Sequence, residues 1–168
     1  VRQSFDVFSS DINNRVINYE KLRKNHKLPS YELLDKEFEL LYMPKLEEIK
    51  FPLRFIRRRI NDKIAWFCNM LQNIIQPNPG SLISLEESKF FSDEDRQSMI
   101  NLLKELMYIE RESVILDIDF DEKKDAEYIN YVLGKLDHVK KEVGRFSEKL
   151  KKGWKEEIKK ENKEEYFG

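Results

Sequence analysis

The chain has 168 residues, of which 40% are hydrophobic and 38% charged, and its formal net charge is −1. This length is enough for one domain with its own core, and the balanced charge excludes a global field that would attract nucleic acid or an anionic membrane. With only 5 glycines and 5 prolines, turns are few and the elements are long, which favours helices over sheets.

The single cysteine, Cys68, excludes a disulfide bond within the chain. No stretch reaches the roughly 18 consecutive apolar residues that a membrane span needs. Residues 1–25 have scattered charges and lack the apolar segment of a signal peptide. We therefore expect a cytoplasmic protein without a membrane span.

The first two helices are expected over residues 4–25 and 30–49. Each carries apolar residues at spacings of three and four, which is the period of one helical face. Ser30 is a suitable N-cap for the second helix, and Pro44 predicts a kink or break near residues 40–43. The two stripes are Phe5, Phe8, Ile12, Val16, Tyr19 and Leu22, then Tyr31, Leu34, Phe38, Leu41, Tyr42, Leu46 and Ile49.

The most continuous apolar stripe belongs to a third helix, expected over residues 52–76. Pro52 suits a first helical turn, and Pro77 ends the helix, because the residue before a proline avoids the helical region. The second half of this helix is apolar nearly all round, which predicts burial by several neighbours. The stripe consists of Leu53, Ile56, Ile60, Ile64, Phe67, Leu71 and Ile74.

Residues 77–91 are expected to form the longest irregular segment, and their apolar side chains indicate that it folds back on the bundle. A fourth helix is expected over residues 93–120. Ser92 is followed three residues later by Asp95, which is the pattern of a capping box. The stripe of the fourth helix is predicted to be Met99, Leu102, Leu103, Leu106, Met107, Ile109, Val114 and Leu116.

The last helix is expected to follow a cap at Asp121 and to run for about 40 residues. Its stripe alternates spacings of three and four, as in a coiled coil: Ile129, Val132, Leu136, Val139, Val143, Phe146 and Leu150. After Leu150 the register shifts and charge dominates. We therefore divide the chain into a helical bundle domain over residues 1–150 and a charged helical extension over residues 151–168.

Four apolar residues stand in this extension: Trp154, Ile158, Tyr166 and Phe167. Two interpretations are open for them. They either fold back on the bundle or dock on a second copy or a partner protein. The second interpretation makes them a hypothetical partner-binding site.

Positive charge gathers at the start of the third helix, in Arg54, Arg57 and Arg58. Guanidinium groups suit phosphates and carboxylates, because their planar fork donates two hydrogen bonds at once. One interpretation is a pocket for a phosphorylated or nucleotide-like anion, with Arg15 and Glu110 as further polar groups. The other is a set of internal ion pairs with residues 93–120, which hold 8 acidic and 3 basic residues. Nucleic-acid binding is disfavoured, because it needs a broad basic face.

Metal sites and catalytic motifs find little support in the sequence. The acidic run over residues 117–121 resembles the start of a calcium loop, but Glu122 stands where that loop needs glycine. Neither His26 nor His138 has a glutamate three residues before it, as a di-metal carboxylate bundle requires. Phosphate-binding glycine loops, nucleophile elbows and zinc spacings do not occur. We expect no metal and no cofactor.

Together these patterns predict an all-α fold, an up-and-down bundle of four to five helices with a long C-terminal helix. The function expected from them is non-enzymatic, through self-association or partner binding. The alternative is a bundle enzyme or binding module for a phosphorylated or nucleotide-like ligand held by the arginines. A homo-oligomer or a protein partner is expected in the first case.

Overall fold

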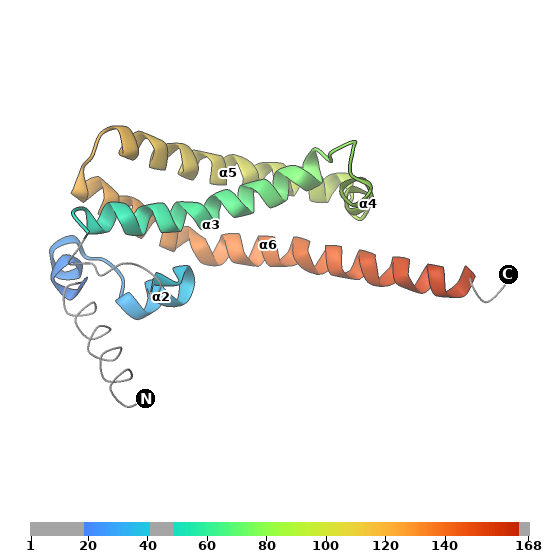
Figure 1. The fold of residues 1–168 in the computed structure, drawn as a ribbon, viewed down its shortest axis with the longest axis horizontal. Helices are drawn as coiled ribbons and strands as arrows, with labels where there is room; N and C mark the ends of the chain where they lie inside the picture. Colours follow the sequence, from blue (N-terminus) through green and yellow to red (C-terminus); the bar gives the residue numbers. More distant parts are fainter. Residues whose placement is uncertain (1–18, 41–48, 165–168) are drawn as a thin grey trace, which may run out of the picture. The chain divides into compact units, whose positions relative to one another are not determined.

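The computed structural model describes residues 19–40 and 49–164. The helices with described bounds are α2 (Tyr31–Phe38), α3 (Pro52–Ile75), α4 (Leu82–Lys89), α5 (Asp93–Ile118) and α6 (Glu122–Glu164). Residues 19–26 are also helical, and no strand occurs in the described ranges. The prediction of an all-α bundle with a long C-terminal helix is confirmed (Figure 1).

Contacts within the chain divide it into two compact units. In the described part, the first unit comprises residues 19–40, 49–64 and 109–134, and the second comprises residues 65–108 and 135–164. Each of α3, α5 and α6 contributes one length to each unit. None of the helices in the described ranges is long and apolar enough to cross a membrane.

Each unit has a core of its own. In the first unit the buried apolar residues are Tyr19, Leu28, Tyr31, Leu34, Phe38, Leu40, Leu53, Ile56, Ile60, Ile64, Ile109, Leu116, Ala126, Tyr128, Ile129 and Val132. In the second they are Phe67, Cys68, Leu71, Ile74, Phe91, Met99, Leu102, Leu106, Leu136, Val139, Val143 and Phe146. Spacings of three and four along α3, α5 and α6 produce both sets, because these spacings keep the residues on one helical face.

α3 supplies apolar side chains to both cores. All seven residues of its predicted stripe are buried, and the most exposed of them, Phe67, shows 5% of its surface. The expectation that the second half is covered all round is wrong, because Trp66 is 59% exposed. The stripe is therefore narrower than the composition of the helix indicated.

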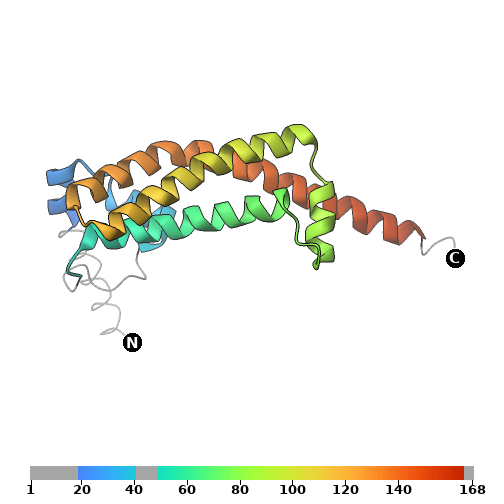
Figure 2. The same cartoon turned by 90° about the horizontal axis from the view of Figure 1, so that it is seen from above.

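The helix starts of α5 and α6 are fixed by the two predicted caps. The Ser92 hydroxyl accepts a hydrogen bond from the Asp95 N–H, and the Asp95 carboxylate accepts one from the Ser92 N–H, both at 3.2 Å. Asp121 accepts hydrogen bonds from the N–H groups of Lys123 and Lys124 at 2.9 and 3.1 Å. Residues 119–121 thus join α5 to α6 in a tight turn (Figure 2).

α2 is shorter than the helix predicted over residues 30–49. Its N-cap is Ser30, as predicted, and it ends at Phe38. Glu39 adopts the left-handed conformation with φ of 55°, and its N–H donates to the carbonyl of Asp35. This ending precedes the break expected from Pro44, which lies outside the described residues, as do residues 4–18 of the predicted first helix.

α4 lies where the sequence indicated an irregular segment. Ser81 is its N-cap, and the Ser81 hydroxyl accepts a hydrogen bond from the N–H of Ser84 at 3.3 Å. No residue of α4 is buried, so the apolar run there does not form a core. The interpretation of residues 77–91 as irregular throughout is wrong, because it passed over this N-cap.

α4 contacts α6 through the residues that follow Leu150. The rings of Phe90 and Trp154 meet edge to face with centroids 5.6 Å apart, and the indole N–H of Trp154 donates to Glu87 at 3.0 Å. Gly153 lies beneath this contact, and a Cβ atom added there would stand 2.3 Å from the Phe90 ring. The extension predicted over residues 151–168 therefore begins with a packed segment, in which Trp154 folds back on its own chain.

Replacement of Gly153 by alanine tests this close approach. Alanine favours a helix over glycine by about 1 kcal/mol, but the new methyl group would displace the Phe90 ring. We expect Gly153→Ala to lower the free energy of unfolding, since overpacking costs roughly 1–3 kcal/mol. Gly144→Ala is the matched control: nothing lies within 4 Å of its added Cβ, so it is expected to stabilise. Urea unfolding would measure both, and equal stabilisation would contradict the packing.

Candidate functional site

The predicted arginine cluster meets the last turn of α5 in the first unit. Arg57 is fully buried, and all three of its nitrogens are used. Its Nε donates to Asp125 at 2.5 Å, its Nη2 to Asp117, and its Nη1 to both the carbonyl, at 2.8 Å, and the hydroxyl of Ser113. One guanidinium therefore joins α3 to both α5 and α6.

Arg54 and Arg58 lie on either side of Arg57 and reach the same carboxylate. The Nε atoms of Arg54 and Arg58 lie 3.4 and 3.0 Å from Oδ1 of Asp117. Arg54 also donates to the main-chain carbonyl of Asp117 and stacks over the Phe120 ring at 5.5 Å. A single carboxylate oxygen thus receives three guanidinium groups.

Burial and charge act in opposition on the two aspartates. Partial burial raises the pKa of Asp117, but hydrogen bonds from Arg57 and Arg58 outweigh it and hold that pKa below its ordinary value. Burial dominates at Asp125 and raises its pKa in spite of the Arg57 hydrogen bond. Asp125 is 1% exposed, and its Oδ2 is the buried side-chain atom of the described part that has no hydrogen-bond partner.

The charge of the cluster is balanced only in part by these acids. Three guanidinium groups share two carboxylates, which leaves one positive charge. The C-terminus of α5 offsets some of it, because Arg54 and Arg57 donate to carbonyl groups in its last turns, where the helix dipole is negative. The internal ion pairs considered for the sequence are present, with Asp125 and Ser113 as partners that were not predicted.

Arg58 is the least engaged of the three. Its side chain is 57% exposed, against 20% for Arg54 and none for Arg57. It donates through Nε alone, and neither terminal nitrogen has a hydrogen-bond partner among the described residues. Arg15, the fourth predicted anion-binding residue, lies outside the described ranges, and Glu110 pairs weakly with Arg111 at 3.8 Å.

An exposed apolar surface occupies the outer side of α5 near the same turn. Val114, Ile115 and Ile118 are 44%, 56% and 83% exposed. Ile118 stands three residues after Ile115 and four after Val114, so it adjoins both on the helix; the three residues together are called the α5 face below. Val114 was predicted to be a core residue, but Ser113 occupies the buried position instead.

The predicted partner-binding residues separate into two kinds. Trp154 contacts α4 within its own chain, whereas Ile158 is 58% exposed. Tyr166 and Phe167 lie outside the described residues. The α5 face therefore presents more contiguous apolar surface than the described part of the extension does.

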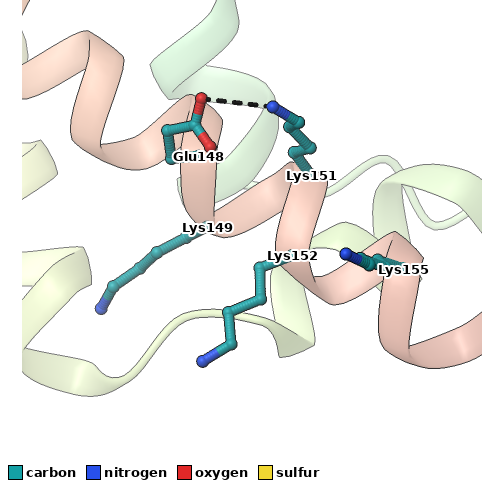
Figure 3. A pocket seen from close by; sticks show the side chains of 5 residues that line it. All are labelled: Glu148, Lys149, Lys151, Lys152 and Lys155. Atoms are coloured by element: carbon teal, nitrogen blue, oxygen red, sulfur yellow. Dashed lines mark ion pairs between the residues drawn. The ribbon is translucent and has the colours of Figure 1, made fainter.

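A hollow of about 460 Å³ lies beside α6 in the second unit (Figure 3). It is lined by Glu148, Lys149, Lys151, Lys152 and Lys155. Lys149 contacts Asp95, and Lys151 lies 3.6 Å from Glu148. Lys151 and Lys152 are 77% and 78% exposed, and such solvated ammonium groups hold an anion only weakly.

A second hollow, of about 340 Å³, lies in the first unit beside the start of α6. Its lining is Asn25, His26, Lys27, Lys123, Ala126 and Glu127. His26 Nε2 lies 2.9 Å from Glu122, which links the helix over residues 19–26 to α6. Among the residues with described positions, no three histidine, cysteine, aspartate or glutamate side chains are grouped so that they could hold a metal ion.

Comparisons with known proteins add no family to this description. No family model, no curated protein and no solved structure matches the chain.

Proposed function

We propose that this chain is a non-enzymatic helical protein of the cytoplasm that acts by binding, and that its α5 face docks on another protein chain or on a second copy. The observation that carries the proposal is the exposure of Val114, Ile115 and Ile118 on adjoining turns. Apolar surface in water costs about 25 cal/mol per Å². A contiguous exposed patch of this kind is typical of an interaction site.

The chemistry of the polar groups supports binding over catalysis. Cys68 is buried in the second unit, so its thiol is shielded from substrates. His138 lies 4.0 Å from Glu105 and is 58% exposed, a geometry typical of a surface pair. Arg54 and Arg57 are engaged in the cluster that holds α3 to α5, which favours a structural role for them over anion capture.

Photo-crosslinking from single positions tests the proposal. A photoreactive amino acid at position 118 should give a discrete covalent adduct in cells that express the chain. Leu82 is the matched control, because it is 84% exposed and Ile118 is 83% exposed. The same reagent at position 82 is expected to give no such adduct. The mass of the adduct would distinguish a second copy from another protein.

An equal pattern of adducts from positions 118 and 82 would mean that exposure alone decides the reaction. If position 118 gave no adduct, the α5 face would lose its support as a docking site. An adduct from position 158 but not 118 would place the interface on the extension instead, as the sequence first suggested.

A further inference from the structure

The α5 face has a cationic border. Asp117 lies three residues after Val114, so Arg58, which donates to Asp117, approaches this side of α5. Arg111 lies four residues before Ile115, also on its side of the helix, and its side chain is 65% exposed. Arg58 and Arg111 are therefore two exposed guanidinium groups beside one apolar patch.

Within the described ranges, both arginines are weakly held by their own chain. Arg58 shares Oδ1 of Asp117 with Arg54 and Arg57, and it leaves its two terminal nitrogens without a partner in the described part. Among the residues with described positions, Arg111 pairs with Glu110 alone, at 3.8 Å. The terminal nitrogens of a guanidinium form the planar fork that binds a carboxylate with two hydrogen bonds. Asp119, which is exposed just beyond Ile118, adds a negative charge at the C-terminal end of the face.

We infer that the α5 face binds an amphipathic helix with an acidic edge, and that a carboxylate of this helix pairs with Arg58. This inference rests on the proposed function and specifies its partner. Apolar residues at spacings of three and four on α5 match the docking of one helix on another. The surplus positive charge of the arginine cluster favours an acidic edge over a basic one, and complementary charge decides which partners are accepted.

The same features disfavour the other anionic partners. A nucleic acid would need a broad basic surface, whereas Glu112 and Asp119 interrupt the positive charge around the face. A free phosphate would gain nothing from the exposed side chains of Ile115 and Ile118. A helical segment uses both the apolar patch and the arginine at its border.

Binding of synthetic peptides to the full chain tests the inference. Two fluorescent helical peptides would share leucines at spacings of three and four and differ in one edge, glutamate in the first and lysine in the second. Anisotropy titration should show the glutamate peptide binding at least about tenfold more tightly. Arg58→Gln should weaken the glutamate peptide by about fivefold, the value of an exposed ion pair.

Arg59→Gln is the matched control for the arginine. Arg59 adjoins Arg58 in sequence, is 40% exposed and pairs with Asp62 at 3.5 Å, so its replacement should leave both peptides unaffected. Ile118→Asp should abolish binding of both peptides. Thermal unfolding of each variant should match that of the parent chain, because Arg58, Arg59 and Ile118 are all exposed.

Different outcomes separate the inference from the proposed function. Equal affinity for the two peptides, or equal effects of Arg58→Gln and Arg59→Gln, would overturn the acidic edge, while the α5 face would stand if both peptides still required Ile118. If Ile118→Asp changed neither affinity, both would fall. Displacement of the glutamate peptide by inorganic phosphate, but not by chloride at the same ionic strength, would assign Arg58 to a phosphate site and overturn the inference.

Discussion

Replacement of Arg57 by alanine is expected to lower the free energy of unfolding by roughly 3–5 kcal/mol, because it would leave a buried aspartate without its counter-charge. Asp125 is 1% exposed and Arg57 is its ion-pair partner in the structure. Loss of the guanidinium would also leave a space beside the Asp125 carboxylate, and the polar groups around this space would keep it from closing. Chemical denaturation at neutral pH would measure the loss.

The pH dependence of this loss provides an internal check. Burial raises the pKa of Asp125, and the Arg57 hydrogen bond opposes that rise. In Arg57→Ala the charge of Arg54 is the opposing influence that remains, so the pKa of Asp125 rises further. As the pH falls, Asp125 therefore takes up a proton sooner than in the parent chain, and its burial costs less. The difference from the parent chain should therefore shrink as the pH falls from neutral towards the raised pKa.

Arg59→Ala serves as the control for charge removal from α3, because its exposed pair with Asp62 is worth at most about 1 kcal/mol. The double variant Arg57→Met, Asp125→Leu should recover most of the stability, since an apolar pair can replace a buried ion pair. Similar losses for Arg57→Ala and Arg59→Ala would show that the cluster contributes little to the fold.

Phe67→Ala is expected to cost roughly 3–5 kcal/mol, through lost burial and the cavity left behind. Phe67 is 5% exposed and belongs to the core of the second unit. The adjacent Trp66, with 59% of its surface exposed, is the matched aromatic control, and Trp66→Ala should change stability by only about 0.5 kcal/mol. A loss below about 1 kcal/mol at Phe67 would contradict its place in the core.

The α3 stripe could be predicted from the sequence because spacing alone decides which side chains share a helical face. The same rule would have placed Ser113 in the core of α5, where it continues the series Met99, Leu102, Leu106, Ile109 and precedes Leu116. Hydrophobicity favoured Val114 instead. The choice of Val114 as the core residue was wrong, because Ser113 is buried against Arg57. The carbonyl and the hydroxyl of Ser113 both accept hydrogen bonds from the Arg57 guanidinium.

The partners of the arginine cluster could be predicted only in part. The acidic residues over 93–120, which include Asp117, were predicted as the class of partner, since opposite charges on neighbouring helices attract. The sequence did not indicate that Asp125 would be a buried partner of Arg57. An aspartate in the first turn of a helix usually lies at the surface, where it interacts with the helix dipole. Its burial depends on where α3 packs on α6, which no local pattern contains.

The contact between α4 and α6 also involves residues far apart in the sequence, so it could be predicted only in part. Ser81 could have been recognised as an N-cap, which would have divided residues 77–91 into a turn and a short helix. The meeting of Phe90 with Gly153 and Trp154 could not, because these residues are far apart in the chain. Position 153 needs glycine because the Phe90 ring approaches it closely. This requirement depends on how α4 and α6 pack on each other.

Arg57 also restricts how α3 can be aligned along its neighbours. Apolar stripes alone tolerate sliding, since a shift by one helical turn, about 5.4 Å, brings similar side chains back into contact. A fully buried guanidinium tolerates none, because its donors must meet Ser113 and Asp117 on α5 and Asp125 on α6 at once. Each shifted alignment would bury these charges unpaired, so Arg57 selects one register of the helices from several that hydrophobic packing alone would allow.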